Sequence, residues 1–572
     1  MAKPVKRNVV IFLNPNHRIF QMKTVTRFFL LLIMGCFYVA CSTSTEPSDN
    51  VTVTVTDGEG QSLPLYGLQL IDANDGWLGT PYKSILGGED NPASLLLQSE
   101  EPVILRIVAP GHHPKFTFLM PDFDKIDFEV SLKSSSMPEE PSPVAVGNFN
   151  NFDSRSGVEM MQDSNGVWTA SIETDLDTVR YFVRFNSLVG APGTNGKIVI
   201  NDDAPGISEA FLSEIVKKEN ESTVQIEFDA SQYTFGVEES AFNIISDNPS
   251  DITGVAHVYT LMTDEYMNQL FATVSHQLRG DEGRYEHDYD SYLTKLNHLL
   301  ESFTHPEVSI AADLARFRFR REIGLSKDDA ISFLDRIEAD SPLWMIHFTA
   351  LTDAVNLAGL NDYTDLLESI VEKSTFESLR AEALYNLIRY HHREENEEEW
   401  HSNFFELVSN YPDHFRTSYA YQNYAPEQPI VEGKALPYNE FNKLDGEGSI
   451  NLYDIEESYL LLDFWATWCG PCIAAIPKLH DLHEHYKDLD FAIVSISVDE
   501  NPERVHSFRN DWEMPWYHGH QKQSSQIIRE MGIVGVPHYI LLGPNRTVIS
   551  NDQAKLRGED FSEVIDSYLN ND

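Results

Sequence analysis

The stretch LLLDFWATWCGPCIAAIPKL, residues 460–479, holds two of the chain's four cysteines and decides how the last quarter of the chain folds. Its first residues are apolar apart from Asp463, which is typical of a buried strand. Cys469 and Cys472 follow, and a helix is expected from about Cys469, since proline is tolerated in a helix's first turn. A Cys-x-x-Cys pair between a strand and a helix is the arrangement used for thiol–disulfide exchange.

The spacing of the two cysteines assigns each a different task. A helix N-terminus lowers the pKa of a thiol, so Cys469 is expected to be the exposed nucleophile. Cys472 lies about one helical turn further on and can attack the resulting mixed disulfide to release the product. A disulfide between them closes a loop too short to stabilise the fold by chain entropy. The pair is therefore expected to serve chemistry rather than structure.

Residues 426–572 around this pair alternate between strand and helix patterns. Alternation of this kind favours an α/β sheet with helices on both faces. The expected elements are strands at 459–464, 491–498, 538–542 and 547–550, with a final helix from about residue 560.

These residues resemble a thioredoxin-fold domain. Asp463 corresponds to the buried acid of that family, Trp468 flanks the nucleophile, and Pro477 corresponds to the proline that kinks the active-site helix. Gly532 to Pro537, GIVGVP, matches the family's cis-proline loop, which implies a cis Val536–Pro537 bond. The segment at 433–437, which precedes the first expected strand of this domain, is similar to the TlpA-like envelope proteins. The long segment after residue 500 is similar to them as well.

The resemblance implies an envelope thiol–disulfide oxidoreductase that reduces protein disulfides. In that reading Cys469 attacks, Cys472 resolves and Asp463 is the acid/base. Trp468, Val536 and Pro537 would shape the face that binds protein dithiol or disulfide substrates. No prosthetic group or metal is implied, and a membrane electron donor would supply reducing equivalents. Ser495 lies near the place where thioredoxin carries a lysine beside its buried acid, and His538 directly follows the cis-proline.

Several alternatives stay open. The redox domain could be accessory in a surface scaffold, or in a lipoprotein that binds a glycan or another partner. The Cys-x-x-Cys pair could instead form a mixed zinc site with His518 or His520, whereas a four-cysteine site is excluded by the cysteine count. An inactive thioredoxin fold and a peroxidase are further alternatives.

Residues 1–41 carry the features of an export signal. A basic segment at 22–27 precedes 13 uncharged residues, 28–40, which are too few to span a bilayer as a helix. Tyr38 to Cys41 resembles a bacterial lipobox, which implies that Cys41 is acylated and anchors the chain to a membrane. A plain cleaved signal or a retained short anchor are the alternatives. The expected location is the bacterial cell envelope, either periplasmic or associated with the outer membrane.

The rest of the chain predicts a multidomain protein. Residues 51–133 and 144–245 read as β-sandwich modules, the second immunoglobulin-like, joined by a Pro- and Ser-rich linker. Residues 252–425 show helical periodicity and form either a TPR-like array or a plain bundle. The expected fold class is therefore N-terminal β-sandwich modules, a central helical region and a C-terminal α/β thioredoxin fold.

The charge of the chain excludes one class of partner. Lys and Arg number 42 against 89 Asp and Glu, which gives a formal net charge of −47. Phosphate backbones are bound by clusters of Lys and Arg, so nucleic acid is not an expected partner. The acidity is typical of a solvated surface that keeps a large protein soluble.

Overall fold

The structure is a computed structural model. It describes residues 50–569 except 78, 89–91, 98, 121–125, 134–141, 151, 153–156, 186–189, 202–209, 219–220, 233–240, 246–251, 279–284 and 558–560. The expected signal region and Cys41 lie outside these residues.

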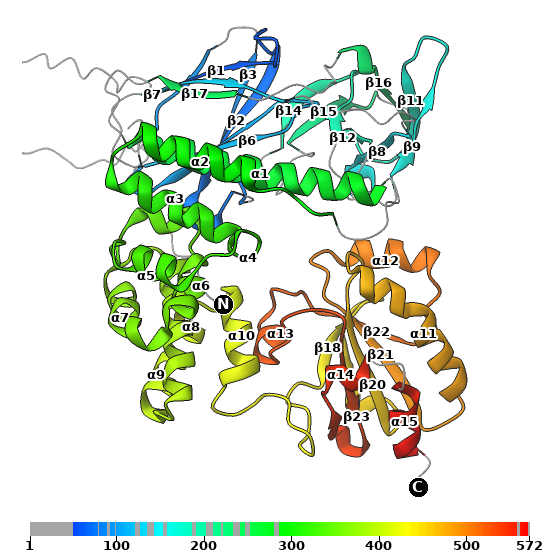
Figure 1. Cartoon of the computed structure of the whole chain (residues 1–572). Coiled ribbons are helices and arrows are strands. Elements are labelled where there is room, and N and C mark those ends of the chain that lie inside the picture. Colours follow the sequence, from blue (N-terminus) through cyan, green and yellow to red (C-terminus); the bar gives the residue numbers. More distant parts are fainter. Residues whose placement is uncertain are drawn as a thin grey trace, which may run out of the picture. The chain divides into compact units, whose positions relative to one another are not determined.

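The first β module consists of two four-stranded sheets (Figure 1). One has the order β17-β7-β1-β4 and the other β3-β2-β5-β6. Val51, Val53 and Val55 alternate with half-exposed threonines along β1, so one face of that strand enters the core between the sheets. The strands are β1 (Val51–Thr56), β2 (Leu65–Asp72), β3 (Lys83–Gly88), β4 (Ala93–Leu95), β5 (Val103–Val108), β6 (Lys115–Leu119), β7 (Ile126–Ser131) and β17 (Ala241–Ile245).

The position of β17 differs from expectation. The sequence placed residues 241–245 at the end of the second module, but they pair antiparallel with β7 of the first. The first module therefore takes its outer strand from a segment more than one hundred residues later in the chain. A strand that joins an exposed sheet edge pairs through its backbone groups. The side-chain pattern of the strand therefore does not indicate which edge it joins.

The second β module also has two sheets. One runs β14-β15-β12-β8-β9, with β13 paired to β12, and the other runs β10-β11-β16. Phe152 packs against Val146, Phe182 and Leu212. The strands are β8 (Val144–Gly147), β9 (Val158–Glu159), β10 (Met161–Gln162), β11 (Trp168–Glu173), β12 (Thr178–Arg184), β13 (Gly190–Pro192), β14 (Lys197–Ile200), β15 (Phe211–Val216) and β16 (Thr223–Phe228).

A helical region follows the β modules, as the sequence predicted. Its hydrophobic core continues into the first β module, because Ile71, Ile104, Phe116 and Phe118 pack among residues of the helices. The helices are α1 (Thr253–Leu278), α2 (Asp290–Ser302), α3 (Pro306–Arg318), α4 (Arg320–Ile323), α5 (Lys327–Leu334), α6 (Ala350–Ala358), α7 (Thr364–Lys373), α8 (Glu377–Arg393), α9 (Glu397–Asn410) and α10 (Phe415–Tyr424).

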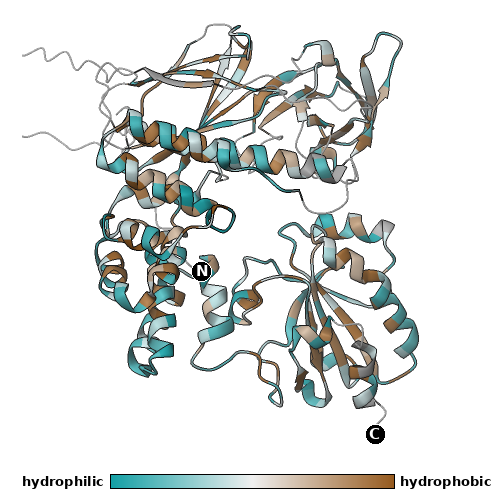
Figure 2. Cartoon of the chain, in the orientation of Figure 1, coloured by the Kyte–Doolittle hydropathy of each residue, from teal (hydrophilic) through white to brown (hydrophobic). Residues whose placement is uncertain are grey.

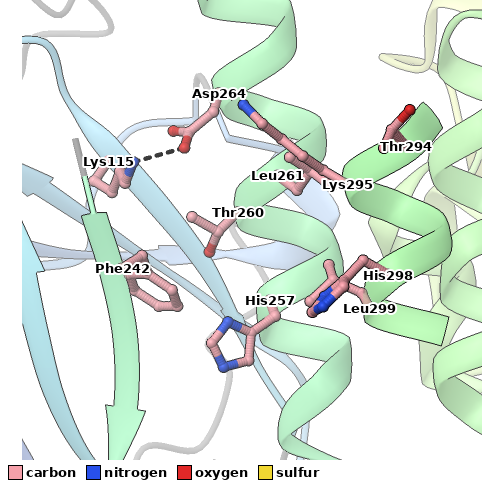
Figure 3. A pocket seen from close by; sticks show the side chains of 10 residues that line it. All are labelled: Lys115, Phe242, His257, Thr260, Leu261, Asp264, Thr294, Lys295, His298 and Leu299. Atoms are coloured by element: carbon pink, nitrogen blue, oxygen red, sulfur yellow. Dashed lines mark hydrogen bonds and ion pairs between the residues drawn. The ribbon is translucent and has the colours of Figure 1, made fainter. Parts of the chain in front are cut away.

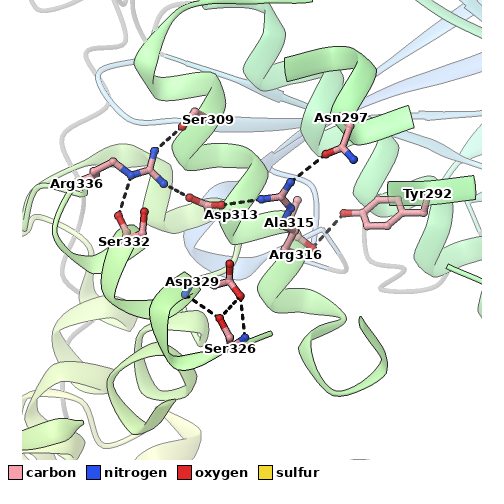
Figure 4. A network of polar contacts seen from close by, with 10 residues as sticks. All are labelled: Tyr292, Asn297, Ser309, Asp313, Ala315, Arg316, Ser326, Asp329, Ser332 and Arg336. Carbon is pink, nitrogen blue, oxygen red and sulfur yellow. Dashed lines mark hydrogen bonds and ion pairs between the residues drawn. The ribbon is translucent and has the colours of Figure 1, made fainter. Parts of the chain in front are cut away.

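Polar contacts join α2, α3 and α5 at their edges (Figure 4). Asp313 on α3 forms ion pairs with Arg316 and with Arg336, which follows α5. Arg316 also donates to Asn297 on α2, over 3.1 Å. Ser326 and Asp329 form a capping box at the start of α5.

The C-terminal part is a seven-stranded mixed sheet with the order β19-β18-β22-β21-β20-β23-β24. Alternate residues of β20 enter different cores on its two faces, so the strand reads as a continuous apolar run. Figure 2 shows the strands largely hydrophobic and the helices carrying hydrophilic surface. The elements are β18 (Glu440–Lys443), β19 (Ser449–Asn451), β20 (Tyr459–Trp465), α11 (Gly470–Tyr486), β21 (Phe491–Ser497), α12 (Pro502–Asp511), β22 (Tyr517–His520), α13 (Gln526–Glu530), β23 (His538–Leu542), β24 (Val548–Ser550), α14 (Gln553–Leu556) and α15 (Phe561–Leu569).

The expected fold class is confirmed: β-sheet modules, a central helical region and a C-terminal thioredoxin-like sheet follow one another along the chain. Across the described ranges, no helix combines the length and apolarity needed to cross a membrane.

Candidate active site

Cys469 and Cys472 lie at the junction of β20 and α11. Cys469 is the N-cap residue of α11, and its Sγ accepts a hydrogen bond from the Cys472 N–H over 3.1 Å. The two sulfur atoms form a disulfide, with the Cα atoms 5.2 Å apart. Free N–H groups and the positive end of the helix dipole therefore face the Cys469 sulfur, which favours its thiolate after reduction.

The cysteine pair is nearly covered, but its neighbour is not. The expectation that Cys469 is exposed is wrong for the disulfide form: Cys469 is 5% exposed, whereas Trp468 is 56% exposed. A large exposed indole next to a reactive sulfur offers an apolar surface to a partner without closing the site.

The cis-proline loop lies against the same sulfur. The expected cis bond between Val536 and Pro537 is confirmed. Cys469 Sγ is 3.6 Å from the carbonyl oxygen of Val536. Val536 and Pro537 therefore share one face with the disulfide.

Asp463 is buried within β20, 2% exposed. Its partner is Ser495, directly opposite in β21, whose hydroxyl donates to Asp463 Oδ2 over 2.7 Å. The same hydroxyl accepts from Trp516 Nε1 over 2.8 Å. Burial raises the pKa of Asp463 to about 7, and the hydrogen bond from Ser495 opposes this increase.

His538 does not bond to the cysteine pair. Its Nε2 lies 2.9 Å from Asn551 Oδ1, which fixes the ring. Burial lowers the pKa of His538 to about 4, so the imidazole is neutral at pH 7.

Asp499 supports the loop before the cysteines, and the sequence reading did not assign it. Its carboxylate accepts from the Thr467 N–H at 2.9 Å and from the Thr467 hydroxyl at 2.6 Å. The Ser497 hydroxyl donates to it as well, over 2.8 Å. β20 and β21 are parallel neighbours, so their carboxyl ends meet at one edge of the sheet. The sequence does carry one signal of this contact, an acidic residue, Asp499, two residues after the end of β21.

A cavity of about 310 Å³ opens beside the pair. It is lined by both the helix and the cis-proline loop, which gives a substrate segment access to the same face. The lining residues are Pro471, Ala475, Lys478, Leu479, Val536, Pro537, Tyr539, Leu556 and Arg557.

The histidines considered for a zinc site bond elsewhere. His518 Nε2 lies 2.9 Å from the Met514 carbonyl oxygen, and His520 Nε2 lies 2.7 Å from that of Asp499. Within the described part of the chain, no three His, Cys, Asp or Glu side chains are grouped so as to hold a metal ion.

Known proteins match this part of the chain. Residues 457–548 match the family described as thioredoxin-like. The thiol-disulfide oxidoreductase ResA of Bacillus thuringiensis subsp. konkukian is 28% identical over 150 residues, which are 26% of this chain and 83% of ResA. The thioredoxin-like protein YneN of Bacillus subtilis is 33% identical over 98 residues, 16% of this chain and 56% of YneN.

A solved thioredoxin domain of a Bacteroides vulgatus thiol-disulfide oxidoreductase is 27% identical, with a TM-score of 0.23. The matched region covers 24% of this chain and 99% of the solved chain. A solved Bacteroides fragilis thiol-disulfide oxidoreductase is 28% identical, with a TM-score of 0.22. The matched region covers 24% of this chain and 100% of the solved chain. The C-terminal part of this chain therefore contains a thioredoxin-like domain, which is similar in sequence to the thiol-disulfide oxidoreductase ResA.

Proposed function

We propose that this chain is an envelope thiol–disulfide oxidoreductase that reduces protein disulfides through Cys469 and Cys472. The observation that carries the proposal is the disulfide at the N-terminus of α11, with Cys469 Sγ 3.6 Å from the Val536 carbonyl oxygen beside cis-Pro537. A disulfide placed to stabilise the fold would not need a helix terminus and an adjacent cavity.

The reaction would proceed in two exchanges. The Cys469 thiolate attacks one sulfur of a substrate disulfide, forming a mixed disulfide and releasing the other substrate sulfur as a thiolate. The Cys472 thiolate then attacks Cys469 Sγ, which closes the Cys469–Cys472 disulfide and frees the second substrate thiol. Two electrons pass from the dithiol to the substrate, and a membrane electron donor would restore the dithiol.

Asp463 would accept the proton of the Cys472 thiol before the second exchange. A carboxyl with a pKa of about 7 can take up and release a proton near neutral pH, as a general base must. Its low exposure favours transfer to a neighbouring group inside the domain over direct exchange with bulk solvent.

Trp468, Val536 and Pro537 would form the substrate face. The Val536 backbone can pair with an extended segment, and the exposed Trp468 indole offers it apolar contact. The two β modules and the helices α1 to α10 take no part in the proposed thiol–disulfide exchange.

Cys41 would hold the protein at the membrane as an acylated residue. The basic segment at 22–27 and the uncharged segment at 28–40 support export, and the lipobox-like Tyr38 to Cys41 supports lipidation. Metabolic labelling with a fatty acid is expected to mark the wild type and not a Cys41→Ser variant. Labelling of both proteins would contradict the anchor.

The roles of the two cysteines are tested by trapping. Cys472→Ser is expected to accumulate a mixed disulfide with insulin, used as a probe substrate, because the resolving thiol is absent. Cys469→Ser is expected to show neither trapping nor reduction. Catalytic reduction by Cys472→Ser at the wild-type rate would reverse or abolish these assignments.

The direction of the reaction is tested by the equilibrium reduction potential of the pair in the intact chain. A reduction potential of about −270 mV, that of thioredoxin, would support the proposal that the domain reduces disulfides. A reduction potential of about −120 mV, that of a strong oxidant, would make the domain a disulfide donor.

A further inference from the structure

A second cavity, of about 530 Å³, is formed by residues outside the cysteine site (Figure 3). Its size lies within the usual range for pockets that bind small molecules. It is lined by two strands, β6 and β17, and by one face each of α1 and α2. The lining residues are Lys115, Phe242, His257, Thr260, Leu261, Asp264, Thr294, Lys295, His298 and Leu299.

Cationic groups outnumber carboxylates in this cavity. Lys115 is 3% exposed, and its Nζ lies 2.6 Å from Asp264 Oδ2. Lys295 extends from α2 toward the same carboxylate, and His298 stands one turn further along α2 (Figure 3). One Asp therefore faces two Lys, in a chain with 89 acidic and 42 basic residues. A local excess of positive charge on an otherwise acidic protein attracts anions.

The hydroxyl groups of the cavity do not supply protons to a ligand. Thr260 donates its hydroxyl proton to the Ala256 carbonyl oxygen at 2.9 Å, and Thr294 donates to that of Asp290 at 2.8 Å. Lys115 donates to Asp264, so Lys295 is the ammonium group at the rim that can pair with a ligand. A ligand that binds it presents an acceptor.

The opposite part of the cavity is largely apolar and includes an aromatic side chain. The Phe242 and His257 rings meet edge to face with centroids 5.7 Å apart. Leu261 and Leu299 complete this part. Aromatic and aliphatic walls combined with a few converging charges are typical of sites for small organic ligands.

We propose that this cavity binds a small organic anion with an aromatic, apolar body. Its anionic group pairs with Lys295 at the rim, and its body lies against Phe242, Leu261 and Leu299. The proposal is independent of the redox chemistry, since no residue of the cysteine site takes part.

The test uses two probes that share a body and differ in charge. 8-Anilinonaphthalene-1-sulfonate carries an aromatic body and one negative charge, and N-phenyl-1-naphthylamine carries the same body without the charge. Titration of the full chain, followed by fluorescence and calorimetry, is expected to show one saturable site for the anion and binding at least tenfold weaker for the neutral amine.

Two charge reversals locate the site. Lys295→Glu is expected to raise the Kd for the sulfonate at least tenfold, because it replaces the cation at the rim by an anion. Lys327→Glu, an exposed residue on α5, changes the net charge equally and is expected to leave the Kd unchanged. Phe242→Leu is expected to weaken the binding of both probes, because it removes the aromatic ring that lines the cavity.

Three results would overturn the proposal. These are several weak sites in place of one saturable site, equal effects of the Lys295 and Lys327 substitutions, and neutral-amine binding as tight as that of the sulfonate. Circular dichroism melts of each variant separate lost binding from lost folding.

Discussion

Asp463 makes the stability of the C-terminal domain depend on pH. Its folded pKa of about 7 lies above the 3.8 that is usual for an aspartate, so the native state holds an extra proton between these pH values. The free energy of unfolding therefore falls as pH rises from about 4 to 7 and stays low above 7. At about 1.4 kcal/mol per pH unit, the loss amounts to about 4 kcal/mol.

Asp463→Asn is expected to remove this dependence. The amide is never charged, so the variant should be more stable than the wild type at pH 8, by about 2–4 kcal/mol, and similar to it near pH 4. Hydrogen exchange of β20 and β21 peptides in the intact chain measures the difference. Equal protection of the two proteins at pH 8 would show that Asp463 is not held with a raised pKa.

Residues of the site could be predicted from the sequence where their chemistry requires a fixed spacing along the chain. Cys469, Cys472 and Pro537 stand at such positions, and the structure brings them together. Asp499 was not readable in this way, because its contact with Thr467 depends on the parallel pairing of two strands. Spacing along one chain does not encode which strand ends meet.

At the level of elements, the Asp499 carboxylate ties the end of β21 to the loop that follows β20. In Asp499→Asn one carboxylate oxygen becomes an NH₂ group, so at least one of the bonds from Thr467 and Ser497 is lost. The disulfide-reduction rate is expected to fall roughly threefold to tenfold, since a loosened loop misplaces Cys469.

The measurement pairs insulin-reduction kinetics with hydrogen exchange of residues 466–469. Glu500→Gln is the matched control, because Glu500 is an exposed neighbour that bonds only to Ser524 and Lys522 among the contacts of the described chain. If both variants lowered the rate equally, the Asp499 contacts would not be what positions the loop.

Arg546 joins the turn after β23 to the segment before β20. Its guanidinium donates to four backbone carbonyl groups, those of Leu452, Ile455, Glu457 and Ser458, over 2.6 to 3.2 Å. Arg546→Lys keeps the charge and loses the planar fork, so it is expected to lower the free energy of unfolding by about 2–4 kcal/mol. Urea titration with hydrogen exchange of β20 tests this. An unchanged midpoint would mean that water replaces these bonds without cost.

Strands and helices with their own periodic pattern were predictable, and pairings between distant strands were not. β23 has the expected bounds, because an apolar run marks it locally. β17 lies in a sheet with β7, across a separation of more than one hundred residues. Local pattern identifies a strand, and only the assembled sheet identifies its neighbour.

At the scale of the molecule, the first β module and the helices share one core. Phe118 of β6 packs on Tyr259 of α1 with ring centroids 5.3 Å apart, and Phe116 lies in the same cluster. The sequence treated 51–133 and 252–425 as separate regions, because the face of β6 that α1 covers reads like the buried face of an ordinary sandwich strand. A shared core implies that the two regions unfold together.

Phe118→Ala tests this joint unfolding in the full chain. Removing a buried ring is expected to cost about 3–5 kcal/mol. If the core is shared, hydrogen exchange should rise in both β6 and α1, while β20 and β21 stay protected.

Phe441→Ala is the matched control, since Phe441 is equally buried in the C-terminal core. It should open β18 and β20 and leave α1 unchanged. Loss of protection in β6 with α1 unaffected would mean that the helices fold by themselves, and the cavity between α1, α2 and the strands would then join two independent units. Joint loss would make that cavity part of a single cooperative body, whose walls are held in place before any ligand arrives.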